Sequence, residues 1–176
     1  MDTENLATNR ENWRSIDGFS NYEVSWCGRV RNATTDRILK GGTGSNGYQI
    51  VVLCREKEKK SHNVHVLVAR EWLLNPNNKR CVDHIDGDKA NNHYENLRWA
   101  THTENMRNRT KHSTSSSVYK GVSFRKQSNK WVVHINVDGK TQHVGLFANE
   151  REAAEAYNAA AIEHYGEFAK LNSFDD

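Results

Sequence analysis

The sequence predicts an α+β protein made of several small modules rather than one large domain. Short runs of alternating apolar residues, separated by glycine-containing turns, occur near both ends, and helical spacing appears between and after them. The 176 residues are 36% hydrophobic and 27% charged, which suits small cores better than one large one. We expect a β-rich N-terminal module at 12–60 and a strand–loop–strand–helix core at 61–108. A linker at 109–117 should then lead to a three-stranded antiparallel sheet packed on one helix at 118–173.

The composition excludes several classes of protein. No apolar run approaches the roughly 18 residues that a membrane helix needs, and the first residues do not form a signal peptide, so we expect a cytoplasmic protein that does not enter membranes. The three cysteines contain no C-x-x-C pair, which supports neither a zinc finger nor a disulfide framework. The net charge of +3 is too small to indicate nucleic acid by itself.

The N-terminal module consists of short strand-like runs, beginning with W-R-S-I at 13–16 and ending with Y-Q-I-V-V-L-C at 48–54. The apolar residues expected to form its small core face are Val24, Val30, Ile38 and Leu39. Arg29 and Arg31 lie close together along the chain. Their charge indicates either contact with DNA or a solvated surface, and the pattern alone does not decide between these.

Residues 63–74 switch to helical spacing, with Val64, Leu67 and Val68 on one face, and Asn75-Pro76 is expected to stop the helix. We expect His65 to pack or to form a hydrogen bond rather than to take part in chemistry.

The central stretch, residues 81–105, is the candidate site. A short run carries Asp83 and His84, a loop with an Asp-Gly-Asp turn follows, and a second run begins at Asn96. Thr101 and Glu104 have the T-x-x-E spacing of a capping box, which predicts a helix start and places Asn105 in its first turns.

These residue types fit metal-assisted phosphodiester hydrolysis. Neutral His84 can accept a proton from water because imidazole titrates near pH ~6.5. Asp83 and Asn105 offer oxygen ligands, which suit Mg²⁺ or Mn²⁺. Asn96 is expected to orient the His84 ring, and the remaining loop asparagines to form turns.

Two alternatives for this stretch remain open. Residues 83–92 loosely resemble a calcium-binding loop, although the ligand register and the closing glutamate are missing. An Asx-rich turn without chemistry would explain any one of the polar residues, but explains the whole set less well.

The stretch resembles the HNH nucleases of the homing type, which have a ββα-metal core. The resemblance is carried by V-H-x-L-V-A at 64–69, D-H-I-D-G-D-K-x-N-N at 83–92, E-N-L-R-W at 95–99 and T-x-x-E-N at 101–105. It implies that Asp83 and Asn105 are metal ligands, His84 is the general base, and Asn96 is the middle asparagine of the motif. An asparagine at 105, where bacterial toxins have histidine, weakens a case for zinc.

The third segment follows a Ser/Thr-rich stretch at 109–117 that is typical of a linker. Asp138-Gly139 between two alternating runs predicts a hairpin. A helix is expected from about Asn149 to Tyr165, with Asn149 and Glu152 at its cap and Gly166 beyond its end.

Charge divides this segment in two. Residues 118–147 contain five Lys or Arg against Asp138 alone, whereas 148–176 contain two against seven Asp or Glu. A basic sheet backed by an acidic helix would present the sheet to DNA. Alternation places Val133 and Ile135 toward the helix and His134 and Asn136 on the other face, although a merely solvated face is the alternative.

Two further resemblances concern the flanking modules. The N-terminal blocks W-x-x-I, N-Y-E-V-S and G-R-V-R-N, over roughly 12–55, resemble a modular DNA-binding element found beside homing nucleases, which implies that Arg29 and Arg31 lie near DNA. The C-terminal blocks Y-K-G-V, K-W-x-x-x-I, G-x-F and E-A-A-x-A-Y-N-x-A-A resemble the DNA-binding domain of plant ethylene-response factors (APETALA-type). The contact residues that this second resemblance implies are Lys120, Arg125, Lys130, His134, Asn136, Thr141 and His143.

Together these features predict a homing-type, metal-dependent DNA endonuclease that acts on double-stranded DNA, leaves a 5′-phosphate and a 3′-hydroxyl, and needs no protein partner. The alternatives are a DNA-binding regulator with an inert nuclease motif and a DNA-degrading nuclease of low specificity.

Overall fold

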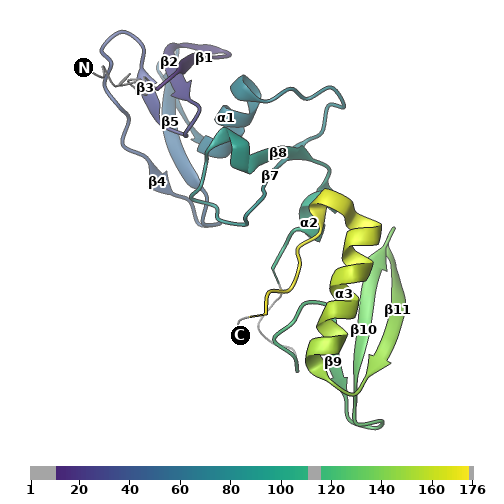
Figure 1. The fold of residues 1–176 in the computed structure, drawn as a ribbon. Helices are drawn as coiled ribbons and strands as arrows, with labels where there is room; N and C mark the ends of the chain where they lie inside the picture. Colours follow the sequence, from purple (N-terminus) through teal and green to yellow (C-terminus); the bar gives the residue numbers. More distant parts are fainter. Residues whose placement is uncertain (1–10, 111–115, 175–176) are drawn as a thin grey trace, which may run out of the picture. The chain divides into compact units, whose positions relative to one another are not determined.

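The computed structural model describes residues 11–110 and 116–174, and it divides into two compact units, residues 1–99 and 100–176 (Figure 1). The expected frayed N-terminus, apart from residue 11, and most of the expected linker, residues 111–115, lie outside the described residues. Each unit is described by itself below.

In the part of the first unit that the structure describes there are three small sheets, one helix and one 3-10 turn. Their order along the chain is β1 (Trp13–Ile16), β2 (Phe19–Ser25), β3 (Val30–Asn32), β4 (Gly42–Thr43), β5 (Gln49–Arg55), β6 (Glu58–Asn63), α1 (Val64–Trp72), β7 (Cys81–His84), η1 (Tyr94–Asn96) and β8 (Leu97–Ala100). The sheets have the orders β1-β2-β3, β4-β5-β6 and β7-β8, and the first two are antiparallel throughout. The β6 strand, which is rich in charged residues, was not expected from the sequence.

One hydrophobic core holds this unit together and crosses the expected module boundary at 60/61. It joins Val24 and Val30 of the N-terminal module to Leu53, Leu67 and other residues of the sheet and helix that follow. Each such side chain, when fully buried, contributes about 1.5 to 3 kcal/mol through removal of apolar surface from water. The expected modules 12–60 and 61–108 therefore do not have separate cores.

Helix α1 forms the centre of this core. Its buried residues, Val64, His65, Leu67, Val68 and Ala69, follow helical spacing, and the helix contacts β1, β2 and β5. It ends at Trp72, slightly before the expected end at 74, because Leu73 is already extended. Ile38, expected in the core, is 39% exposed, whereas its neighbour Leu39 packs against the core. The hydrophobic pattern did not distinguish them because both lie outside regular strands.

The second unit begins with α2 (His102–Arg107), continues through β9 (Val122–Arg125), β10 (Lys130–Val137) and β11 (Lys140–Phe147), and ends with α3 (Glu150–Tyr165) and η2 (Gly166–Phe168). The sheet is antiparallel with the order β11-β10-β9, and α3 lies across one face of it (Figure 1). Val133 and Ile135 pack against Ala153 and Tyr157 of that helix. The fold class predicted from the sequence is confirmed.

The turn and cap residues of the second unit act as expected. Asp138 and Gly139 both have positive φ, at 51° and 79°, which is the conformation that a two-residue hairpin requires. Asn149 accepts a hydrogen bond from the Arg151 N–H at 2.7 Å, and α3 ends at Gly166, whose φ is 54°. At Gly121, with φ of 76°, an added Cβ would lie 2.0 Å from the Tyr157 ring, so only glycine allows this close approach.

Among residues 11–110 and 116–174, no helix is long and apolar enough to cross a membrane.

Candidate active site

Asp83 and His84 end strand β7 and are both buried, with 4% and 5% exposure. Burial of two polar side chains costs free energy unless hydrogen bonds or ion pairs compensate for the lost contact with water. The contacts of Asp83 and His84 are therefore described one by one below. The backbone N–H of Ile85 donates to the Asn96 carbonyl at 2.8 Å, which joins the end of β7 to the η1 turn.

Asp83 forms an ion pair with Arg98 of strand β8. The guanidinium donates from Nε and Nη2 to Oδ2 of Asp83, at 2.9 and 2.8 Å. The two side chains are 6% and 12% exposed, so the pair is held largely away from water. Removal of one partner would take this contact away from a charge in a buried position, which is costly. Arg98 thus anchors the carboxylate that was expected to bind metal.

Asn92, Tyr48 and His65 contact the His84 ring. Its Nε2 lies 3.2 Å from Oδ1 of Asn92. The Tyr48 ring stacks on it with centroids 5.8 Å apart and an interplanar angle of 23°, and the His65 ring lies 5.0 Å away at 59°. These residues come from the turn directly before β5, from α1 and from the loop after β7, so segments distant in sequence converge on the expected base.

The amide that contacts the His84 ring is therefore that of Asn92, which corrects the expectation for Asn96. The Asn96 side chain instead secures the loop: its Nδ2 donates to Oδ1 of Asp86 and to the Asn91 carbonyl, both at 2.9 Å, and its Oδ1 accepts from the Asp86 N–H at 3.1 Å. Asn92 is also more than the turn-former expected, because it is only 3% exposed and its side chain points to the ring. Asn92 and Asn96 are only four residues apart, and spacing along the chain did not show which of the two amides would contact His84.

Asp86 is the centre of the loop between β7 and η1. Burial alone would raise the pKa of Asp86, but hydrogen bonds from Asn91 and Asn96 lower it below the usual value. Lys89 fastens the same loop to the β4–β5 connection, where its Nζ donates to the Asn46 carbonyl at 2.8 Å and lies 4.8 Å from the centre of the Tyr48 ring. The loop that carries Asn92 is thus held by hydrogen bonds within it and by one to the β4–β5 connection.

His65 stands beside His84 as an uncharged neighbour. It is 5% exposed, and its Nδ1 has no hydrogen-bond partner among the described residues. Burial, and then the proximity of His84, lowers the pKa of His65 from 6.5 to about 4. The expectation that His65 packs is confirmed, and near neutral pH it adds no positive charge beside the expected base.

His65 also makes stability depend on pH. When pH falls from 6.5 toward 4, the unfolded chain takes up a proton at this histidine and the folded chain does not, because its pKa is about 4. Stability is therefore lost as pH decreases through that window, by about 2 to 3 kcal/mol. Urea unfolding at pH 7 and pH 4.5 measures how much the free energy of unfolding decreases between these two values. In a His65→Phe variant this decrease should be smaller than in the wild type by about 2 to 3 kcal/mol. His164→Phe, at an exposed site on α3, is the matched control, and equal losses in all three proteins would contradict the prediction.

Asn105 lies on α2, which belongs to the second unit. The helix begins with the expected capping box: the Glu104 N–H donates to Oγ1 of Thr101 at 3.2 Å, and the Thr101 N–H donates to the Glu104 carboxylate at 2.7 Å. The Arg107 guanidinium lies 4.7 Å from the centre of the Tyr165 ring, which ties the end of α2 to the end of α3. The pairing of Asn105 with Asp83 remains a prediction.

Most of the expected DNA contacts lie on one face of the C-terminal sheet. They form three directly opposed pairs on neighbouring strands, Arg125 with Lys130, His134 with His143, and Asn136 with Thr141. All six are exposed. Val133 and Ile135, which alternate with them, are buried against α3, so the alternation expected from the sequence is present.

Three other expected DNA contacts have partners within the protein. Lys120 is half-buried, and its ammonium donates to the carbonyls of Arg107 and Arg109 at the end of α2, which corrects its expected place on the DNA-facing surface. Burial, and then the charge of Lys170, lowers the pKa of Lys120 to about 8. Arg29 pairs with Glu11 at 2.7 Å, and Arg31 pairs with Glu23 and Asp36 at 2.6 and 3.0 Å. The positive charge of this part of the N-terminal module is therefore largely balanced.

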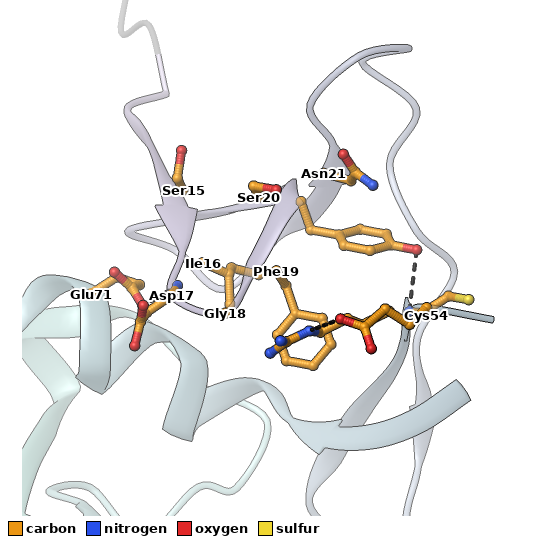
Figure 2. Close-up of a pocket in the computed structure, with 12 residues that line it drawn as sticks. Ser15, Ile16, Asp17, Gly18, Phe19, Ser20, Asn21, Cys54 and Glu71 are labelled. Carbon is orange, nitrogen blue, oxygen red and sulfur yellow. Dashed lines mark hydrogen bonds and ion pairs between the residues drawn. The ribbon is translucent and has the colours of Figure 1, made fainter. Parts of the chain in front are cut away.

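A hollow of about 790 Å³ lies elsewhere, between the β1–β2 hairpin and the β5–β6 turn (Figure 2). Glu71 of α1 borders it and accepts a hydrogen bond from the Asp17 N–H at 3.1 Å, and the Tyr22 hydroxyl accepts from the Cys54 N–H at 3.3 Å. Its other polar lining comes from Ser15, Ser20 and Asn21 and from the ion pair of Arg55 with Glu56. This hollow contains none of the residues expected to act in catalysis, so the buried Asp83–His84 pair and not the hollow marks the candidate site.

The donor atoms near Asp83 fit an oxygen-preferring ion. Residues 11–110 and 116–174 contain no group of three or more His, Cys, Asp or Glu side chains placed to hold a metal. A structural zinc site needs about four such ligands, whereas Mg²⁺ is usually held by one or two carboxylates together with water and substrate phosphates. The Asp83 carboxylate meets the second requirement.

Family models match two parts of the chain. A model of the HNH endonuclease family matches residues 75–107, and a model of the NUMOD4 motif matches residues 11–54. The matched residues fall within or close to the segments whose sequence resembles HNH nucleases and the modular DNA-binding element found beside them.

Individual relatives extend these matches. DNA endonuclease I-HmuI of Bacillus phage SP01 is 33% identical over 129 residues, which cover 72% of this chain and 74% of that protein. An uncharacterized HNH endonuclease of Acanthamoeba polyphaga mimivirus is 34% identical over 126 residues, 70% of this chain but only 36% of the relative. An AP2-like ethylene-responsive transcription factor of Arabidopsis thaliana is 40% identical over 62 residues, 34% of this chain and 11% of that protein.

A solved structure gives the same result. The structure described as DNA binding and cleavage by the HNH homing endonuclease I-HmuI matches with a TM-score of 0.54 and 25% identity, and covers 88% of this chain and 91% of that chain. The chain is 33% identical to I-HmuI over 74% of that protein, and its residues 75–107 match the HNH endonuclease model. This chain therefore belongs to the HNH endonuclease family.

Proposed function

We propose that the protein is a homing-type DNA endonuclease that hydrolyses phosphodiester bonds of double-stranded DNA with a divalent metal ion. The observation that carries the proposal is the buried Asp83–His84 pair, in which the carboxylate is anchored by Arg98 and the imidazole is held by Asn92. An idle site would not need two buried polar residues with such matched partners, because each costs free energy to bury.

Within this proposal His84 is the general base. A neutral imidazole takes the proton from the water that attacks phosphorus, and the packed Tyr48 and His65 rings keep it in one orientation. Asp83 would hold Mg²⁺ or Mn²⁺ together with Asn105, and Arg98 keeps the carboxylate in place for that purpose. When bound, the ion would neutralise charge that develops on the phosphate and the leaving oxygen. Asn96 keeps the loop that carries Asn92 in shape.

Recognition of DNA is assigned to the exposed sheet face of the second unit. Three features support this: the paired polar and basic side chains listed above, their position opposite the helix, and the acidic character of the remaining C-terminal residues. The identity with a plant ethylene-responsive factor supports an AP2-like fold for this unit. The contact residues that we propose are Arg125, Lys130, His134, Asn136, Thr141 and His143.

Mapping of cleavage sites tests the whole proposal. The full chain would be incubated with a genomic library of double-stranded DNA and Mg²⁺, and the new ends sequenced. Cutting at a few related sites, leaving 5′-phosphate ends and abolished by a chelator, is the expected result. Ends spread evenly over the library would indicate a degrading nuclease, and specific binding without any cutting would indicate a DNA-binding regulator.

A further inference from the structure

Helix α2, which carries Asn105, is too short to be stable by itself. It has six residues, whereas an isolated helix shorter than about 12 to 15 residues is only marginally stable in water. None of these six residues, all of which the structure describes, is buried, so α2 adds little apolar surface to a core. Its shape therefore depends mainly on the contacts at its two ends, and the capping box is the contact at the first end.

The other end of α2 is bound by Lys120. The Lys120 ammonium donates to the carbonyl oxygens of Arg107 and Arg109, the second at 2.8 Å. The last carbonyls of a helix have no partner within it, and they carry partial negative charge. A half-buried ammonium at this place satisfies two such acceptors and favours the helical conformation. Lys120, in the segment before β9, thus caps α2.

Lys120 is in turn held by residues near the C-terminus. Its backbone N–H donates to Oδ1 of Asn172 at 2.6 Å, and its carbonyl accepts from Nδ2 of Asn172 at 3.1 Å. The backbone of Asn172 is paired in the same way with the side chain of Asn158 on α3, at 2.8 and 2.9 Å. A continuous path of hydrogen bonds therefore leads from α3 through Asn172 and Lys120 to the end of α2.

Arg107 gives α2 a second attachment. Its guanidinium lies 4.7 Å from the centre of the Tyr165 ring, and its Nη2 lies 3.5 Å from Oδ1 of Asp138 in the β10–β11 turn. Helix α2 also contacts η2, which follows α3 (Figure 1). The contacts of Arg107 and of Lys120 lead to the same sheet and helix, so α2 is built into the second unit.

We propose that Lys120 is a positioning residue that holds α2, and with it Asn105, in the second unit. The unit assigned to DNA recognition would then also shape one part of the nuclease motif. This role rests on the proposed function, because it matters for cutting only if Asn105 helps to hold the metal ion. Lys120 acts through α2 and touches neither the ion nor DNA, unlike the DNA contact that its resemblance to plant factors implies.

Hydrogen–deuterium exchange of the full chain, followed by NMR, tests this role without any cutting. The amides of Asn105, Asn108 and Arg109 donate to carbonyls of the α2 segment. Lys120→Met keeps the side-chain stem but removes the ammonium, and it should raise the exchange rates of these amides by about 10-fold. Lys120→Arg keeps a charged donor and should restore most of the protection. Lys126→Met, which removes an exposed lysine from the β9–β10 turn, is the matched control.

Cleavage kinetics and DNA binding separate a positioning role from a DNA contact. Lys120→Met should lower kcat by about 10- to 100-fold with unchanged KM for DNA, as is typical when a group that orients a ligand is lost. Lys120→Arg should recover most of kcat. The salt dependence of DNA affinity, measured with Ca²⁺ in place of Mg²⁺, should equal that of the wild type. A raised KM and a salt slope reduced by about one would show that Lys120 neutralises a phosphate, and would overturn the proposal.

The two measurements distinguish the two proposals. If the wild type cuts DNA but Lys120→Met changes neither exchange in α2 nor kcat, the positioning role is wrong and the endonuclease proposal stands. A lower kcat without faster exchange in α2 also excludes the positioning role. If exchange responds as expected but the wild type does not cut, the endonuclease proposal is wrong and the attachment of α2 by Lys120 stands.

A second substitution keeps the test decisive if Lys120→Met does not fold. Lys120→Gln retains an N–H donor but is shorter and uncharged, so it should protect the α2 amides less well than Lys120→Arg does. Equal exchange rates in α2 for Lys120→Gln, Lys120→Arg and the wild type would overturn the proposal.

Discussion

Replacement of His84 by alanine should lower the rate of phosphodiester cleavage by about 10²- to 10⁴-fold, the usual contribution of a general base, and leave DNA affinity unchanged. The ring is buried and held by Asn92, Tyr48 and His65, so its removal takes away the proton acceptor without altering the exposed sheet face assigned to DNA binding. Single-turnover nicking of a plasmid that contains the mapped site measures the first effect, and a binding titration with Ca²⁺ in place of Mg²⁺ measures the second.

Two controls make this result interpretable. Loss of the ring leaves the Asn92 oxygen without its partner in a buried place, at a cost of about 1 to 3 kcal/mol, so thermal unfolding must show that the variant is still folded at the assay temperature. His164→Ala removes an exposed imidazole from α3 and should cut at the wild-type rate. Nicking by His84→Ala at the wild-type rate would show that another group accepts the proton.

Asp83→Ala should abolish the dependence of cutting on Mg²⁺ and lower the rate by about 10³-fold or more, since a bound ion is worth several kcal/mol and each 1.36 kcal/mol is a factor of ten. The structure adds a second effect of this substitution. Arg98, which is 12% exposed, loses the carboxylate that it contacts at 2.8 Å, so the variant should also be less stable, by about 3 to 5 kcal/mol.

Comparison with two further variants separates ligand loss from destabilisation. The double variant Asp83→Ala with Arg98→Met removes both charges and should recover much of the stability but none of the activity. Asp88→Ala removes an exposed carboxylate from the same loop and should keep the wild-type Mg²⁺ titration. The same titration curve for Asp83→Ala and the wild type would exclude Asp83 as a metal ligand.

Features that depend on a few neighbouring residues were predictable from the sequence. The capping box at Thr101, the Asp138-Gly139 hairpin and the end of α3 at Gly166 are present as expected. Each depends on backbone groups only one to four residues away, so spacing along the chain contains the information required. The same holds for the alternation of β10, because a strand turns successive side chains to opposite faces whatever packs against it.

Features that depend on contacts between distant segments were not predictable. The core of the first unit joins Val24, Leu53 and Leu67, which a division at residue 60 would have separated. Lys120 carries the charge expected of a DNA contact, but its ammonium binds carbonyls at the end of α2. The charge of a residue in a sequence does not show whether it contacts DNA, the protein itself or water.

The candidate site contains some features that the sequence predicted and others that only the fold revealed. The sequence by itself determined that Asp83 and His84 lie together at a strand end, that Asn105 lies in the first turns of a helix, and that the C-terminal sheet has one polar and one apolar face. Only the tertiary structure decided that Arg98 holds Asp83 and that Asn92 rather than Asn96 holds His84. Both asparagines have the same amide, and the choice between them depends on which one the folded loop, tied to Asn46 by Lys89 and to β5 by Gln49, brings to within 3.2 Å of the ring. That is a matter of position in space, which local residue patterns do not encode.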